Sequence, residues 1–146
     1  MAKSFRDHLM DGDFSYLEPF LDLKRIEPLD AEAQAEALTC ACFLGRTDIA
    51  EALLERGVDP AAGNRTGLDA LHWAADRGQI EAVRLLLRYN APLETRSMYD
   101  GTVLGAAVWS ALHARRPQHA QIIEELLRAG ARRDAVDEAQ LQEALS

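Results

Sequence analysis

The sequence predicts an all-α fold, a solenoid of stacked helix–turn–helix units joined by short hairpin-like loops. The first observation is a period of 33 residues, which is visible in three sets of landmarks. They are Gly12, Gly45 and Gly78; Leu38, Leu71 and Leu104; and the pair Leu53-Leu54, which recurs as Leu86-Leu87. The second observation is that each repeat holds two short segments with apolar residues at helical spacing. One such hairpin cannot bury its apolar face alone, so neighbouring units must stack.

Length and charge fit a single domain that binds neither nucleic acid nor membrane. The chain has 146 residues, of which 48% are apolar, enough for one continuous core. Its net charge is −8, whereas nucleic acid and anionic membranes attract basic proteins. Because no apolar run could span a membrane and the N-terminus lacks the apolar segment of a signal peptide, we expect a cytoplasmic protein. Fourteen of the 16 basic residues are Arg, a bias typical of a GC-rich, bacterial genome.

The first two units are expected at 4–29 and 30–63. Residues 4–29 are interpreted as a degenerate N-terminal capping unit, because an end unit has a neighbour on one side only. In the second unit, Asp30 is expected to cap a first helix that runs from Ala31 to about Phe43.

Two cysteines lie in this first helix of the second unit, Cys40 and Cys42. Two residues apart on a helix, their side chains point about 200° from each other and cannot form a disulfide. We therefore expect both to be small buried residues, as befits a reducing compartment.

The third unit, 64–96, shows the helix pair most clearly. Its first helix has a narrow apolar stripe of Leu71 and small alanines, which lets the second helix approach closely. Gly78 then provides a left-handed position at which the first helix ends. The second helix presents four apolar residues on one face, namely Ile80, Val83, Leu86 and Leu87.

The fourth unit, 97–134, contains a seven-residue insertion. Leu71 and Leu104 keep the 33-residue period, but Leu86 and Leu126 are 40 apart, so the extra residues fall between about Val108 and His119. We expect the insertion to lengthen the first helix of the unit and to end in a loop, with Pro117 beginning the next helix.

A C-terminal capping helix is expected within 135–146. Asp137 can cap a helix from Glu138 to Leu145, and apolar residues at Leu141 and Ala144 would lie on the fourth unit. This segment is acidic, which suits a solvated lid.

The third unit resembles the ankyrin repeat. Residues 67–78 read Gly-Leu-Asp-Ala-Leu-His-Trp-Ala-Ala-Asp-Arg-Gly, similar to the ankyrin pattern G-x-T-P-L-H-x-A-A-x-x-G. Residues 82–87 and 90–93 resemble the later V-V-x-L-L-L and G-A-D-V motifs, and the resemblance covers roughly residues 30–134. Asp69 and Ala70 replace the Thr-Pro of that pattern, although Asp69 can still cap the helix.

The sequence shows no arrangement typical of catalysis or of metal binding. His72 falls on the histidine of the ankyrin pattern, which the resemblance implies is a hydrogen-bonding strut between repeats. The alternative of a metal pair at His113 and His119 is disfavoured, since no third ligand has suitable spacing. No nucleophile elbow, phosphate-binding loop or dinucleotide motif is present. We therefore expect no catalytic residue, no metal, no cofactor and no enzymatic activity.

The resemblance implies that a partner protein binds the concave face, formed by the hairpin tips and the exposed side of each first helix. In this register the face comprises Phe43, Leu44, Arg65, Leu68, Asp76, Arg77, Met98, Tyr99 and Trp109, with Arg115 and Arg116 contributed by the insertion. Large apolar residues beside arginines are typical of binding hot spots. An alternative is that Phe43 packs inward under the first unit and Trp109 under the insertion.

A basic cluster near the C-terminus has two interpretations. Its members are Arg115, Arg116, Arg128, Arg132 and Arg133. They can serve solubility and pair with the acidic C-terminal segment, or they can dock an acidic partner.

The function expected from these features is a non-enzymatic, monomeric module that binds another protein with a rigid preformed face. An adaptor is one form of this function. An inhibitor or immunity-type protein is another, because a charge of −8 suits the masking of a basic partner enzyme or toxin. A small-molecule binder or enzyme that uses the concave groove is the remaining alternative, and it would require a pocket with convergent titratable groups.

Overall fold

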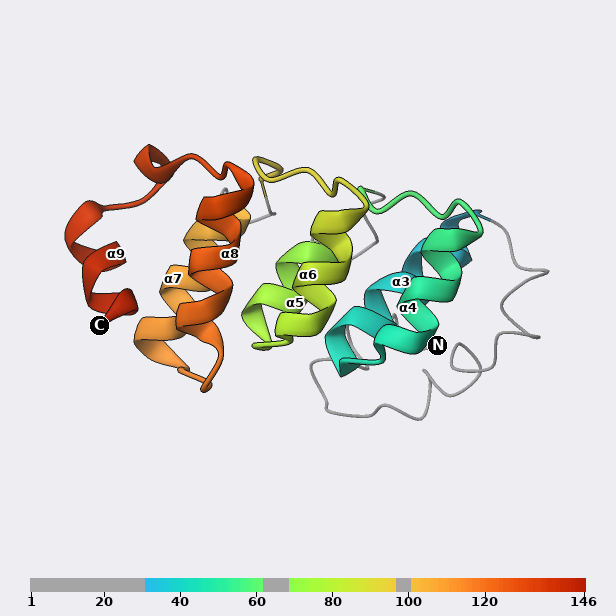
Figure 1. Cartoon of the computed structure of the whole chain (residues 1–146), viewed down its shortest axis with the longest axis horizontal. Helices are drawn as coiled ribbons and strands as arrows, with labels where there is room; N and C mark the ends of the chain where they lie inside the picture. Colours follow the sequence, from blue (N-terminus) through green and yellow to red (C-terminus); the bar gives the residue numbers. More distant parts are fainter. Residues whose placement is uncertain (1–30, 62–68, 97–100) are drawn as a thin grey trace, which may run out of the picture.

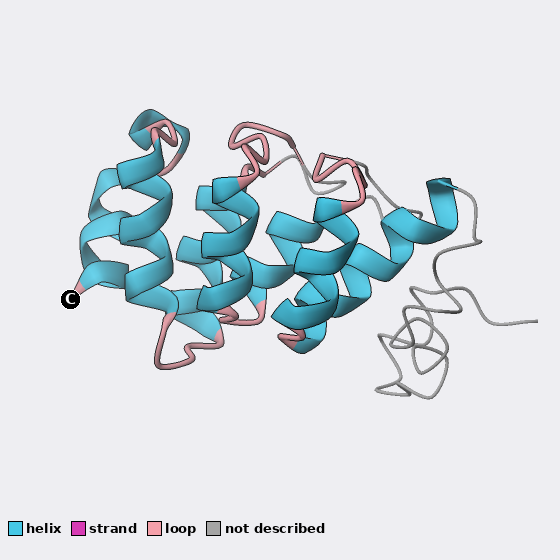
Figure 2. Ribbon diagram, turned by 45° about the vertical axis from the view of Figure 1, so that its right-hand side comes forward, coloured by secondary structure: helices cyan, strands magenta, loops and turns pink. Residues whose placement is uncertain are grey.

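The computed structural model describes residues 31–61, 69–96 and 101–146, with the side chains of 31–33 left out (Figure 1). The predicted N-terminal unit at 4–29 lies outside these residues. Within the described residues the elements are α-helices and one short 3-10 helix, with no strand (Figure 2). They are α3 (Ala31–Leu44), α4 (Thr47–Glu55), α5 (Ala70–Asp76), α6 (Ile80–Arg88), α7 (Val103–His113), α8 (His119–Ala129), η2 (Arg133–Ala135) and α9 (Glu138–Leu145).

The helices form two stacked layers (Figure 1). In the first row, α3 packs on α5 and α5 packs on α7. In the second row, α4 packs on α6 and α6 packs on α8. Each helix of the first row also packs against the helix that follows it, so the three hairpins α3–α4, α5–α6 and α7–α8 stand side by side. This arrangement confirms the predicted all-α repeat fold.

The core runs along the interface between the two rows. Small residues of α5 bring its backbone close to α6, and Ala70, Ala74 and Ala75 are buried. On α6 the expected Ile80, Val83 and Leu86 are buried, but Leu87 is only half-buried and Leu85 takes its place in the core. The predicted apolar face was too narrow because α6 packs on α4, α5 and α8, and therefore buries three of its sides.

Left-handed glycines end α3 and α5, and side-chain caps begin α5 and α7; of these, Gly78 and Asp69 were predicted. Gly45 and Gly78 adopt left-handed φ angles of 75° and 72°, which a residue with a Cβ rarely adopts. The Asp69 side chain accepts a hydrogen bond from the His72 amide and so caps α5. Thr102 caps α7 in the same way, through the Gly105 amide.

One predicted helix boundary is confirmed and one was wrong. The first helix of the second unit runs from Ala31 to Leu44, in agreement with the expected end at about Phe43. In the region of the insertion, α7 runs for 11 residues to His113, but Pro117 does not begin α8. Pro117 lies in a turn that the Arg116 carbonyl closes by accepting a hydrogen bond from the His119 amide, so α8 begins at His119.

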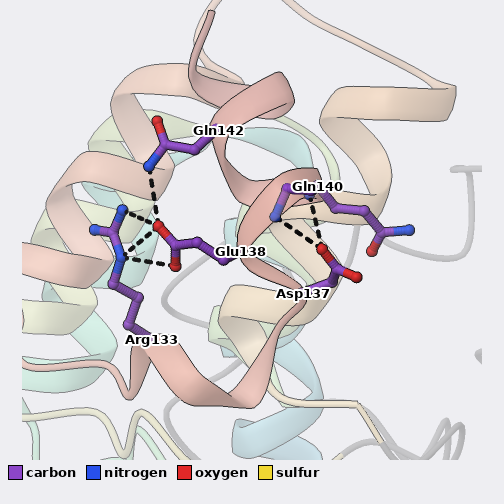
Figure 3. A network of polar contacts seen from close by, with 6 residues as sticks. Arg133, Asp137, Glu138, Gln140 and Gln142 are labelled. Carbon is purple, nitrogen blue, oxygen red and sulfur yellow. Dashed lines mark hydrogen bonds and ion pairs between the residues drawn. The ribbon is translucent and has the colours of Figure 1, made fainter.

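The C-terminal helix α9 covers the end of the stack. It packs on α7 and α8 and buries Leu141 and Ala144 against them. Asp137 caps its N-terminus through the amides of Ala139 and Gln140, as predicted (Figure 3). Arg133 holds Glu138 in an ion pair of 2.7 Å. None of the described helices is both long enough and apolar enough to cross a membrane.

Acid is expected to loosen α9 through Glu138. The hydrogen bonds from Arg133 and Gln142 lower the pKa of Glu138 from its ordinary 4.5 to about 2 (Figure 3). The stability that this depressed pKa contributes is present above pH 4.5 and is lost as the pH falls toward about 2. Hydrogen exchange of the α9 amides between these pH values measures the effect. Glu138→Gln removes the titrating group, and an equal acid response in this variant would contradict the prediction.

Candidate protein-binding surface

Trp109 is the exposed large apolar side chain of the described residues. It lies on α7 and is 59% exposed. Its ring stacks on His113, with centroids 4.5 Å apart and planes at 20°, and His113 Nδ1 lies 2.8 Å from the Trp109 carbonyl oxygen. The interpretation that Trp109 packs inward under the insertion is therefore wrong. The helix instead presents a stacked indole to solvent.

Phe43 is buried, so its predicted role as a partner contact was wrong. The side chain is 5% exposed. Its ring packs edge-on against Trp73, with centroids 5.3 Å apart, and the Arg77 guanidinium lies 4.7 Å from its centroid. Phe43 thus packs inward, between neighbouring helices of the first row. Leu44, another predicted contact, is half-buried against the same cluster.

Trp73 was missed by the sequence analysis. It is half-buried and joins α5 to α3 through Phe43. The sequence does show an aromatic residue at the variable position of the L-H-x-A motif. It does not show which residue Trp73 contacts, because that contact depends on the aromatic residue of the preceding unit.

Asp76 and Arg77 lie together at the end of α5. The Ser110 hydroxyl of α7 donates a hydrogen bond of 2.7 Å to Asp76 Oδ1. Arg77 is half-buried, and its pKa is lowered first by burial and next by the positive charge of Arg116. Asp76 opposes this shift more weakly. Two arginines are therefore held near each other at this end of the first row.

The two arginines of the insertion have different roles. Arg115 donates from Nη2 to the Ala144 carbonyl at 2.8 Å, so its guanidinium ties the α7–α8 loop to the end of α9. Arg116 is exposed, and its Cδ lies 3.0 Å from where a Cβ on Gly78 would stand. Arg116 therefore rests on the turn that follows Arg77.

His119 braces this loop from inside. Its side chain is fully buried, and Nδ1 accepts a hydrogen bond of 2.9 Å from the Arg116 amide. Nε2 must then carry the proton, and it donates to the Asp76 carbonyl at 3.1 Å. Since both ring nitrogens are engaged, the suggested metal pair of His113 and His119 was wrong. Within the described residues no group of His, Cys, Asp and Glu could hold a metal ion.

The remaining arginines of the predicted basic cluster pair locally. Arg132 contacts Asp134 at 3.0 Å, and Arg133 contacts Glu138 in the acidic C-terminal segment. Arg128 pairs with Glu125 at 3.3 Å. These pairs match the local-pairing interpretation. The predicted contacts Arg65, Leu68, Met98 and Tyr99 lie outside the described residues.

The buried titratable side chains serve structure. His72 lies 2.9 Å from Asp69 through Nδ1 and 3.3 Å from the Gly101 carbonyl through Nε2, which makes it the strut between repeats that the resemblance implied. Cys40 and Cys42 are free and buried, as predicted. Burial, together with the charge of Asp69, raises the pKa of Cys42 to about 12, so its thiol stays protonated.

The surface defined by these contacts consists of Asp76, Arg77, Trp109, His113 and Arg116, and is called the Trp109 surface below. It joins the C-terminal ends of α5 and α7 through the hydrogen bond between Ser110 and Asp76. An exposed indole and two arginines on neighbouring helix ends of a braced scaffold suit the binding of another macromolecule.

Comparison with known proteins gives the family. The family model described as Ankyrin repeats (3 copies) matches residues 11–97 and 38–137. The chain therefore belongs to the ankyrin-repeat family, as its sequence indicated. Ankyrin repeats are in general protein–protein interaction modules, and the family is typically non-enzymatic.

Two relatives match about half of the chain. Protein PhlB of Serratia liquefaciens is 38% identical over 78 residues, which are 53% of this chain and 34% of that protein. The Protein fem-1 homolog A-like of Mus musculus is 40% identical over 70 residues, which are 48% of this chain and 11% of that protein. The matched segment thus spans a minor part of either relative.

Proposed function

We propose that the protein binds a partner protein through the Trp109 surface, without catalysing a reaction. The observation that carries this proposal is Trp109 itself, which is 59% exposed on an otherwise well-packed row of helices. Tryptophan is enriched among the residues that dominate binding energy, because it buries a large rigid area. The stack on His113 fixes the indole before binding, so little side-chain entropy is lost when a partner docks.

A non-catalytic role agrees with the state of the candidate catalytic groups. The ring nitrogens of His72 and His119 are engaged in buried contacts, and both thiols are buried. An adaptor and an inhibitor would use the same surface. They differ in whether binding changes the activity of the partner, which an assay of the partner with and without this protein measures.

Trp109→Ala is expected to weaken partner binding by about 30-fold, the equivalent of the ~2 kcal/mol lost at a hot spot. Partners captured from a lysate by the wild-type chain would be identified by mass spectrometry and their affinities then measured with purified components. Leu127→Ala, on the second row, is the matched truncation and should leave the affinity unchanged. Circular dichroism verifies that both variants are folded. Equal affinities of Trp109→Ala and wild type would contradict the proposal.

A further inference from the structure

The arginines of the Trp109 surface differ from most other arginines of the described structure, which form ion pairs with nearby carboxylates. These pairs join Arg46 to Asp48, Arg84 to Glu81 and Glu125, Arg128 to Glu125, Arg132 to Asp134, and Arg133 to Glu138. Arg116 instead packs on Gly78, the residue that follows Arg77, so the two arginines lie near each other. Neither of them forms an ion pair within the described residues. Two like charges held together repel each other and favour a negative group between them.

Both arginines are held in place by neighbours other than carboxylates. Arg77 lies over the Phe43 ring at 4.7 Å, a cation–π contact that leaves its hydrogen-bond donors available. Arg116 rests against Gly78, and the loop that carries it is fixed by His119 from one side and by Arg115 from the other. The positive charge of this site is therefore preorganised.

The one carboxylate of the Trp109 surface is engaged. Asp76 Oδ1 accepts the hydrogen bond from Ser110, which joins the sequence neighbours of Arg77 and Trp109 across the two helices. The same bond therefore brings the charged and the apolar parts of the surface onto adjacent helix ends. A ligand that matches it must carry a negative group and an apolar group a short distance apart.

We propose that the partner presents an acidic segment to this surface, with a carboxylate between Arg77 and Arg116 and an aromatic or aliphatic side chain on the Trp109 indole. This inference rests on the proposed function and specifies its ligand. It differs from the expectation for the whole chain, whose charge of −8 favours a basic partner. A direct ion pair depends on the charges around it, because salt screens exposed charges that lie more than about 10 Å apart.

A peptide is favoured over a nucleic acid as the source of the negative group. Nucleic-acid binding gains its affinity by neutralising many phosphates, which two arginines on a chain of charge −8 do not provide. A single carboxylate suits two guanidinium groups, each of which can bind it with paired hydrogen bonds.

The test is a selection of random dodecapeptides displayed on phage against the immobilised full-length chain. Selected peptides would be synthesised with a fluorescent label, and their affinities measured by anisotropy at low and at high salt. We expect an excess of Asp and Glu next to Phe, Leu or Trp in the selected peptides, and affinity that falls with salt. Arg116→Gln should weaken binding by about tenfold and Arg77→Gln/Arg116→Gln by more.

Matched controls separate this inference from the proposed function. Arg88→Gln removes one exposed positive charge on α6 and should bind like wild type. If Arg77→Gln/Arg116→Gln is poorly folded, Arg116→Gln alone decides, since its side chain is exposed. Replacement of Asp and Glu by Asn and Gln in a selected peptide should reproduce the loss.

Several results would overturn the inference. Selected peptides without an acidic excess, Arg116→Gln binding like wild type, or no peptide binding up to about 1 mM would each contradict it. Tighter binding of a single-stranded oligothymidylate than of any peptide would assign the site to nucleic acid instead. If Trp109→Ala loses the selected peptides while Arg116→Gln retains them, the proposed function stands and only the acidic ligand fails. If Trp109→Ala retains them as well, the surface itself is wrong.

Discussion

Asp69→Ala is expected to lower the free energy of unfolding by about 3 kcal/mol. The Asp69 side chain is almost fully buried, and Oδ1 lies 2.9 Å from both the amide and Nδ1 of His72. Alanine removes the cap of α5, which costs about 1 kcal/mol, and leaves a buried ring N–H without an acceptor, which costs about 1–3 kcal/mol. Since His72 also reaches the Gly101 carbonyl, the loss extends to the contact between α5 and the segment before α7. Urea denaturation, monitored by circular dichroism, measures this loss in the free energy of unfolding.

Asp69→Thr is the matched control. Threonine stands at this position in the ankyrin pattern, and its hydroxyl can accept a hydrogen bond as Asp69 Oδ1 does. Asp69 Oδ2 is buried and has no hydrogen-bond partner among the described residues, so its removal offsets part of what the weaker threonine bonds lose. We expect this variant to stay within about 1 kcal/mol of wild type. If the alanine variant also stays within about 1 kcal/mol of wild type, the side-chain hydrogen bonds of Asp69 do not stabilise the fold.

Leu71→Ala is expected to destabilise the chain by about 3 kcal/mol. Leu71 is fully buried in α5, which packs on α3, α6 and α7, so its removal leaves a cavity at the centre of the described stack. A repeat protein depends on contacts between neighbouring units, and a defect in a middle unit weakens both sides.

The half-buried Leu127 of α8 provides the comparison. Leu127→Ala should cost about 1 kcal/mol, because part of its side chain is already in water. Thermal unfolding of the two variants ranks them. A midpoint of Leu71→Ala equal to that of Leu127→Ala would contradict the assignment of Leu71 to the centre of the core.

Local features of the fold were predictable from the sequence because they depend on a few neighbouring residues. The 33-residue period gave the helix pairs, Asp69 and Asp137 were recognisable as caps, and Gly78 was recognisable as a left-handed turn. The caps and the glycine turn each act within one helix turn, so tertiary packing does not alter them. The width of the apolar face of α6 was underestimated, because it depends on how many helices surround it.

The candidate surface was only partly predictable. Trp109 was expected on it and is exposed, whereas Phe43 was expected on it and is buried. Phe43 and Trp109 occupy the same place in the second and fourth units, so the repeat register could not separate them. The difference arises from Trp73 and Arg77, which cover Phe43. The role of His119 depended on the path of the inserted loop, for which the ankyrin pattern offers no template.

A partner protein that binds the Trp109 surface covers the indole of Trp109. Oxidative footprinting of the wild-type chain, alone and in the presence of a captured and purified partner, tests it without any substitution. We expect Trp109 to be oxidised readily in the free chain and protected in the complex, while the half-buried Leu127 of α8 in the second row is modified equally in both. Equal oxidation of Trp109 in the free and bound chain would contradict the claim and place the partner elsewhere.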